Sequence, residues 1–101
     1  MSEPVAVVTL TNPGHPREVK GKYSAKRTVM IDREWTVEVD GVLVGHIRYH
    51  MVTHERRSKG KMYVDSRWQS PGWGWREVGG RYWFHPHSKK DAIRSLLWQA
   101  R

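Results

Sequence analysis

The sequence predicts an α+β fold: an antiparallel β-sheet of three to five strands with one C-terminal α-helix packed on one face. Two observations predict this fold. Most of the chain consists of short segments with β-branched or alternating apolar residues, separated by glycine and proline turns. One segment with apolar residues at helical spacing follows them at the C-terminus. The length of 101 residues fits a single domain, residues 1–101.

The N-terminal quarter is expected to lie at the periphery of that domain. Residues 5–11 are rich in β-branched side chains and predict a strand, which the proline- and glycine-containing run at 12–16 ends. Residues 17–27 are strongly basic and suit either an irregular basic strand or a mobile arm. We therefore expect residues 1–27 to add a peripheral strand and an arm to a sheet and helix formed by 28–101.

The clearest strand pair surrounds Asp40-Gly41. This dipeptide favours the type I′ turn of a two-residue hairpin, because both turn positions need positive φ. Apolar and polar residues alternate on both sides of the turn, which is the period of a half-buried strand. In the register that this turn sets, Val37 faces Val44. The apolar residues change phase after Gly45, so we expect a β-bulge at that glycine.

The rest of the chain is expected to complete the sheet and add the helix. The elements are, in order, a basic loop at 53–61, a strand at 62–68, a turn at 69–72, and strands at 73–78 and 81–85. Ser88 suits a helix N-cap, with Asp91 at the third helical position. The apolar stripe of this helix is Ile93, Leu96, Leu97 and Ala100. We expect it to pack on Trp35, Val37 and Val64.

The charge of the chain favours an anionic partner. Eighteen Lys and Arg residues stand against ten Asp and Glu residues, a formal net charge of +8. Nucleic acid is the first candidate, and an acidic protein or a membrane surface is the next. The plain alternative is a basic domain whose charge only aids solubility. The absence of cysteine excludes disulfides and thiolate chemistry. Without a signal peptide or a membrane span in the sequence, we expect a cytoplasmic protein, nucleoid-associated if bacterial or phage.

A single helix covers one face of a sheet, so the other face is the expected contact surface. Arginine can pair with phosphates there or read guanine in the major groove, while aromatic rings can stack on bases or sugars. The candidate residues on the sheet are Arg48, Tyr63, Arg67, Trp73, Trp75, Arg76 and Arg81. The basic loop adds the candidate phosphate-binding residues Arg56, Arg57, Lys59 and Lys61.

The C-terminal segment resembles the end of an AP2-type DNA-binding domain. The matching residues are Arg81, Trp83, Phe84, Ser88, Asp91 and Ala92. The resemblance extends to the related arm-binding domains of integrases. It implies a three-stranded sheet packed on one C-terminal helix, with Arg and Trp on the open face in the DNA major groove. The chain is also similar to short proteins of actinobacteria and their phages, most of which have no assigned function.

Several tryptophan and histidine residues have a structural as well as a functional interpretation. Trp73 and Trp75 share one side of an extended chain, and they form either a contact surface or an aromatic cap on a thin core. Trp83 and Trp98 are expected between sheet and helix. His46, His50 and His54 share a strand face, but neighbours in this series lie about 13 Å apart, too far for one metal ion.

The expected function is non-enzymatic binding of double-stranded DNA, because no catalytic or phosphate-loop motif is present. No cofactor, no metal and no membrane partner are expected. The alternative is a protein-interaction module of a phage or mobile element, whose basic face binds and inhibits an acidic host protein. RNA or single-stranded nucleic acid is a third possibility, marked by a row of exposed aromatic rings.

Overall fold

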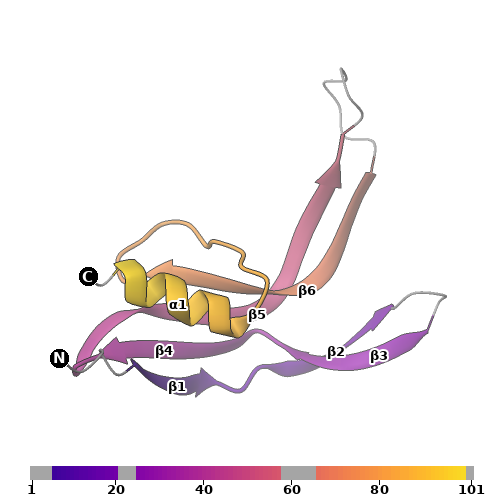
Figure 1. The fold of residues 1–101 in the computed structure, drawn as a ribbon. Helices are drawn as coiled ribbons and strands as arrows, with labels where there is room; N and C mark the ends of the chain where they lie inside the picture. Colours follow the sequence, from indigo (N-terminus) through magenta and orange to yellow (C-terminus); the bar gives the residue numbers. More distant parts are fainter. Residues whose placement is uncertain (1–5, 21–24, 58–65, 100–101) are drawn as a thin grey trace.

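A computed structural model describes residues 6–20, 25–57 and 66–99 (Figure 1). The elements are β1 (Ala6–Asn12), β2 (His15–Lys20), β3 (Lys26–Ile31), β4 (Arg33–Val39), β5 (Val42–Arg56), β6 (Ser66–Glu77) and α1 (Lys89–Gln99). Four strands form one antiparallel sheet in the order β1-β4-β5-β6, and β2 and β3 form a second, two-stranded sheet. The predicted α+β class with one C-terminal helix on a sheet is confirmed.

Two hairpins extend the molecule beyond the part that α1 covers. Figure 1 shows the outer part of the β5–β6 hairpin and the β2–β3 hairpin projecting from the body of the sheet. The Cα radius of gyration is 16.4 Å, against about 13 Å for a compact domain of this length. The basic segment 17–27 was expected to be an irregular strand or an arm, but its described residues belong to the two regular strands of the β2–β3 hairpin: 17–20 lie in β2, and 26 and 27 lie in β3. The predicted basic loop is also partly wrong, because β5 continues to Arg56.

The β4–β5 turn confirms the predicted hairpin. Asp40 and Gly41 have φ values of 53° and 79°, as a type I′ turn requires. The register shifts between Val37 and Glu38, where Val37 pairs with Gly45 and Val44 is the additional residue. The expected bulge exists, but the expected pairing of Val37 with Val44 is wrong by one residue. Position 45 faces the helix, and a β-carbon there would collide with Leu96, so only glycine fits at this position.

The hydrophobic core lies between α1 and the middle of the four-stranded sheet. Its buried residues are Trp35, Val37, Ile47, Trp75, Ala92 and Leu96. The helix begins as predicted, since the Asp91 N–H donates to Ser88 Oγ at 3.1 Å. The expected stripe is only partly correct: Ala92 joins Leu96 in the core, whereas Leu97 is half-buried. Val64 and Ala100 lie outside the described residues.

Strand β6 runs through the predicted turn at residues 69–72 without a break. It lies at the edge of the sheet, and the Trp75 N–H and C=O point outward to bond Phe84. Every second residue of a regular strand has the same orientation. Pro71, four residues before Trp75, therefore lacks its N–H at a position that faces away from β5. The proline therefore costs the sheet no hydrogen bond, and the strand continues through it. The predicted turn is wrong.

The connection from β6 to α1 is not the strand predicted at residues 81–85. It runs back along β6, as Figure 1 shows, and pairs with it only through the bridge of Trp75 with Phe84. The two tryptophans expected between sheet and helix are elsewhere. Trp83 lies on the other face of the sheet, where it contacts Arg48, and the side chain of Trp98 is exposed.

Candidate nucleic-acid interface

The alternation of glycine and tryptophan in β6 separates the two faces of the sheet. Trp73 and Trp75 point to the side of α1, where Trp75 is 8 % exposed and belongs to the core. Gly72 and Gly74 fall on the opposite side, which we call the helix-free face. The expectation that Trp73 and Trp75 lie on the open face is therefore wrong, because the odd-numbered positions of this strand face the helix.

The helix-free face holds a compact cluster of two arginines and one tryptophan. Arg48 of β5 pairs with Gly74, and Arg76 lies two residues further along β6. The Cζ atoms of Arg48 and Arg76 lie 4.3 Å and 4.8 Å from the centroid of the Trp83 ring. We call these three residues the Arg–Trp cluster. Gly74 makes room for it, since a β-carbon there would lie 3.3 Å from Trp83 Cε3.

Neither arginine of the cluster forms an ion pair among the described residues, although Glu34 is the cross-strand neighbour of Arg48. Each Nε atom is buried and lacks a hydrogen-bond partner within the same part of the chain. Other arginines are paired: Arg57 and Arg67 contact Glu55, with N–O distances of 3.5 Å and 2.9 Å. A guanidinium group carries five N–H donors, so the cluster presents two positive charges with donors to spare.

A buried histidine borders the cluster. His50 is 9 % exposed, and its ring stacks on that of His85 with centroids 5.4 Å apart. Burial of the ring is the main cause that lowers the pKa of His50 from 6.5 to about 4; the neighbouring Arg48 and His85 act in the same direction, and Asp32 acts against them. His50 is therefore neutral at pH 7, and the positive charge here comes from the arginines.

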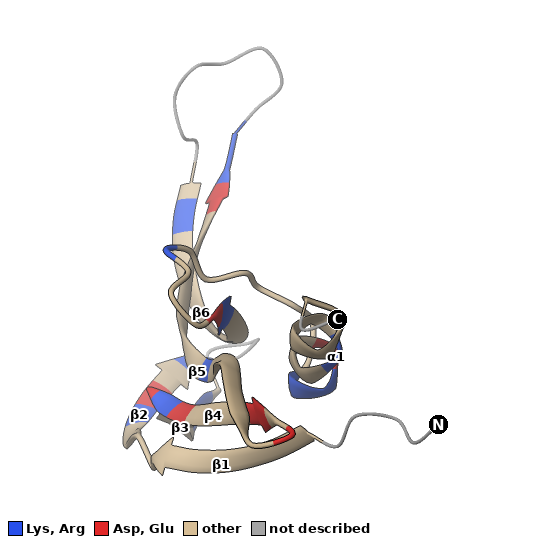
Figure 2. Ribbon diagram, turned by 90° about the vertical axis from the view of Figure 1, so that its left-hand side faces the viewer, with Lys and Arg blue, Asp and Glu red and all other residues tan. Residues whose placement is uncertain are grey.

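The helix-free face continues along the outer part of the β5–β6 hairpin. His54 and Trp68 are cross-strand partners, and their rings stack with centroids 5.4 Å apart. The Trp68 side chain is 49 % exposed. Figure 2 shows Lys and Arg on both strands near the outer end of this hairpin. An exposed aromatic ring and several basic side chains thus follow the Arg–Trp cluster along the same two strands.

The structure brings together some of the residues that the sequence predicted. Arg48 and Arg76 meet in the cluster, and Arg56 and Arg57 lie at the outer end of the β5–β6 hairpin. Arg67 also lies at that end, but the expectation that it faces the open side is wrong, because it pairs with Glu55 on the same side of the strands as Trp73. Arg81 is exposed in the β6–α1 connection. The predicted residues Lys59, Lys61 and Tyr63 lie outside the described part of the chain.

Sequence reasoning placed Trp83 on the wrong side of the sheet. The available signal was the spacing of Gly72 and Gly74, which leaves two side-chain positions empty on one face of a strand. An empty position of this kind favours the close approach of another ring or of backbone. Trp83 fills the place above Gly74.

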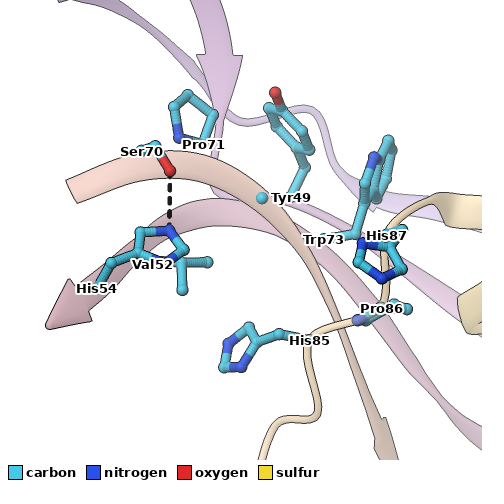
Figure 3. Close-up of a pocket in the computed structure, with 10 residues that line it drawn as sticks. Tyr49, Val52, His54, Ser70, Pro71, Trp73, His85, Pro86 and His87 are labelled. Carbon is cyan, nitrogen blue, oxygen red and sulfur yellow. Dashed lines mark hydrogen bonds between the residues drawn. The ribbon is translucent and has the colours of Figure 1, made fainter. Parts of the chain in front are cut away.

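A hollow at the edge of β6 offers a further group of polar side chains (Figure 3). It has a volume of about 450 Å³ and is lined by residues of β5, of β6 and of the connection to α1. Figure 3 shows His54 and His85 on one side of it and Tyr49 and Trp73 on the other. His54 Nε2 lies 2.9 Å from Ser70 Oγ. This pair has no carboxylate to orient the ring in the described residues, so it does not form a catalytic triad.

The described residues contain no group of three or more His, Asp or Glu side chains that could hold a metal ion. Within the same residues, no helix has the length and apolar character needed to cross a membrane. Comparison of the chain with protein-family models, curated protein sequences and solved structures finds no significant match.

Proposed function

We propose that the protein binds double-stranded DNA through the helix-free face, with Arg48 and Arg76 bonded to backbone phosphates. The observation that carries this proposal is the Arg–Trp cluster, in which two guanidinium groups that form no ion pair within the described residues lie over one indole ring. The net charge of +8 adds the long-range attraction that a polyanion needs.

The state of Trp83 favours a duplex over a single strand. Single-stranded nucleic acid is bound by aromatic rings that offer an open face for base stacking. Two guanidinium groups already lie over the ring of Trp83, so its contribution is to position cations. Cations in fixed positions suit phosphates, which position a protein on DNA and carry no base identity.

The outer end of the β5–β6 hairpin extends this contact. Arg56, Arg57 and Arg67 lie there; exposed Trp68 is on the helix-free face, whereas Arg67 is on the opposite face with Glu55. Glu55 pairs with two of these arginines, and its carboxylate would compete with a phosphate for them. We therefore assign the main affinity to Arg48 and Arg76, and a secondary role to the hairpin end.

The test compares two double variants with the same change in net charge. Arg48→Gln with Arg76→Gln removes both charges from the cluster, whereas Lys90→Gln with Arg94→Gln removes two charges from α1. Binding to a short DNA duplex is measured by fluorescence anisotropy between about 50 and 200 mM salt, the range in which phosphate contacts change affinity most visibly. Circular dichroism verifies that both variants are folded.

The cluster variant is expected to lose affinity at least about tenfold. The slope of log K against log salt becomes shallower by about 1.8, since each phosphate contact contributes about 0.9. The α1 variant keeps the wild-type slope. Equal losses in the two variants, a flat salt response, or tighter binding of a single strand of the same length would each overturn the proposal. An acidic protein partner that survives nuclease treatment, with no affinity for DNA, would support the protein-interaction module instead.

A further inference from the structure

A second hollow lies on the other side of the sheet, between β3 and the start of α1. Its volume is about 600 Å³, within the range of about 300–1,000 Å³ that is typical of small-molecule sites. Its lining combines three aromatic residues, two apolar residues and two cations: Trp35, Tyr49, Trp73, Val29, Met30, Arg33 and Lys89. We call it the aromatic hollow.

Three strands supply the aromatic wall. The rings of Trp35 and Trp73 have centroids 5.4 Å apart, and the Tyr49 ring meets Trp73 edge-on with centroids 4.7 Å apart. Tyr49 and Trp73 are direct cross-strand partners, so the sheet fixes their positions. The wall is therefore preformed, which lowers the entropy that a flat ligand loses when it binds.

Two cations stand over one ring of this wall. Lys89 Nζ lies 4.3 Å and Arg33 Cζ lies 5.4 Å from the centroid of Trp35. Neither side chain has a carboxylate partner within the described residues, and Arg33 Nε is buried there without a hydrogen-bond partner. Both cations line the hollow without an anionic partner among the described residues, so an anion bound there would be attracted by both positive charges.

We infer that the aromatic hollow binds a small flat aromatic anion. The ring of the ligand stacks against Trp73 and Tyr49, and its anionic group bonds to Arg33 and Lys89. A nucleoside monophosphate and an aromatic carboxylate share this chemistry. The hollow and the Arg–Trp cluster lie on opposite faces of the sheet, so this inference does not depend on DNA binding.

The cations distinguish a binding site from a plain aromatic cap on the core. Stacked aromatic side chains at the end of a thin core need only apolar neighbours to gain area. The hollow instead places Arg33 and Lys89 at its rim, with an open volume beside them. A ligand that fills this volume would bury both the aromatic wall and the charges.

The test measures binding by calorimetry and by tryptophan fluorescence with four probes. They are adenosine 5′-monophosphate, adenosine, indole-3-carboxylate and inorganic phosphate, each up to about 10 mM, above the millimolar limit of weak specific binding. At least one of the two aromatic anions is expected to show saturable binding. The anion with the higher affinity shows whether the site prefers a nucleoside monophosphate or an aromatic carboxylate. Adenosine and inorganic phosphate bind about tenfold more weakly or not at all, because each lacks one half of the required chemistry.

Single variants then test the site itself. Arg33→Gln and Lys89→Gln are each expected to weaken the aromatic anion about fivefold or more, whereas Lys90→Gln, the exposed neighbour, leaves its affinity unchanged. The variant of Arg48 and Arg76 also keeps this affinity, so failure of DNA binding and failure of this inference are distinguishable. No saturable binding of either anion by the wild-type protein, or wild-type affinity in both the Arg33→Gln and the Lys89→Gln variant, would overturn the inference. Thermal melting of each variant verifies that a loss of affinity is not a loss of fold.

Discussion

Trp83 rests on β6 only because Gly74 has no side chain. A β-carbon at residue 74 would lie 3.3 Å from Trp83 Cε3 and 3.0 Å from Nε2 of His50. Both distances are tighter than ordinary van der Waals contact, so the ring would have to move. The position of the two guanidinium groups over Trp83 thus depends on a glycine in a neighbouring strand.

The first prediction is that Gly74→Ala weakens DNA binding as well as stability. The added methyl group displaces Trp83, and overpacking of this kind costs about 1–3 kcal/mol. Gly72→Ala is the matched control, because its β-carbon meets Val52 on the same face and not Trp83. Urea unfolding and duplex binding are measured for both variants. An unchanged DNA affinity in Gly74→Ala would show that the indole does not position the arginines.

The second prediction concerns the start of α1. Ser88→Ala removes the oxygen that accepts the Asp91 N–H at 3.1 Å, and loss of such a cap costs about 1 kcal/mol. For a domain of this size, the melting temperature falls by about 4–8 °C. Ser88→Asp retains an accepting oxygen and keeps the wild-type melting temperature. A Ser88→Ala variant that melts with wild type would mean that another group caps the helix.

The third prediction tests the turn between β4 and β5. Gly41 has a φ of 79°, and no other atom lies within 4 Å of a β-carbon built there. Gly41→Ala therefore costs only backbone strain, about 1–2 kcal/mol. Asp40→Asn, at the neighbouring position of positive φ, is expected to be neutral or slightly stabilising, since asparagine is favoured in this turn. Chemical denaturation compares the two, and equal stabilities would contradict the strain account.

The fourth prediction is a loss of stability in mild acid that depends on His50. Its pKa falls from 6.5 in the unfolded chain to about 4 in the folded protein, mainly because the ring is buried. Between these two values the unfolded chain binds a proton that the folded chain does not. The free energy of unfolding therefore falls as the pH decreases from about 6.5 to about 4, by at most on the order of 3 kcal/mol.

The measurement is urea unfolding at several values between pH 4 and pH 7. Replacement of the buried ring in His50→Leu reduces the slope of stability against pH over this interval. His87→Gln serves as a control that removes an exposed histidine from the same chain. A slope that is as steep in His50→Leu as in His87→Gln would assign the acid sensitivity to other groups.

Features that depend on neighbouring residues could be predicted from the sequence. The Asp40-Gly41 turn and the Ser88 cap are of this kind, because their geometry is set by backbone preference and by one local hydrogen bond. The α+β class follows from the order of strand and helix patterns. Arg48 and Arg76 were expected on the open face together with Arg67, Trp73 and Trp75, and the register of β5 with β6 puts only the two arginines of the cluster there.

Features that depend on distant pairing could not be predicted in the same way. The outward orientation of Pro71 is visible only once β6 is known to be an edge strand. The spacing of Trp73 and Trp75 predicts that both side chains point to the same face of the sheet. Which face that is depends on tertiary packing, because Trp75 belongs to the core beneath α1. Trp83 belongs to a connection without regular structure, so no periodic pattern indicates the face it covers.

Pro71 also has a consequence for the behaviour of many copies of this protein in solution. The outer part of β6 is a long strand with one open side, and such an edge is a template for the addition of further strands. An incoming strand would meet a missing donor at residue 71 and a pyrrolidine ring in its path. The proline therefore opposes sheet-to-sheet aggregation at the position where the sheet itself does not need its N–H.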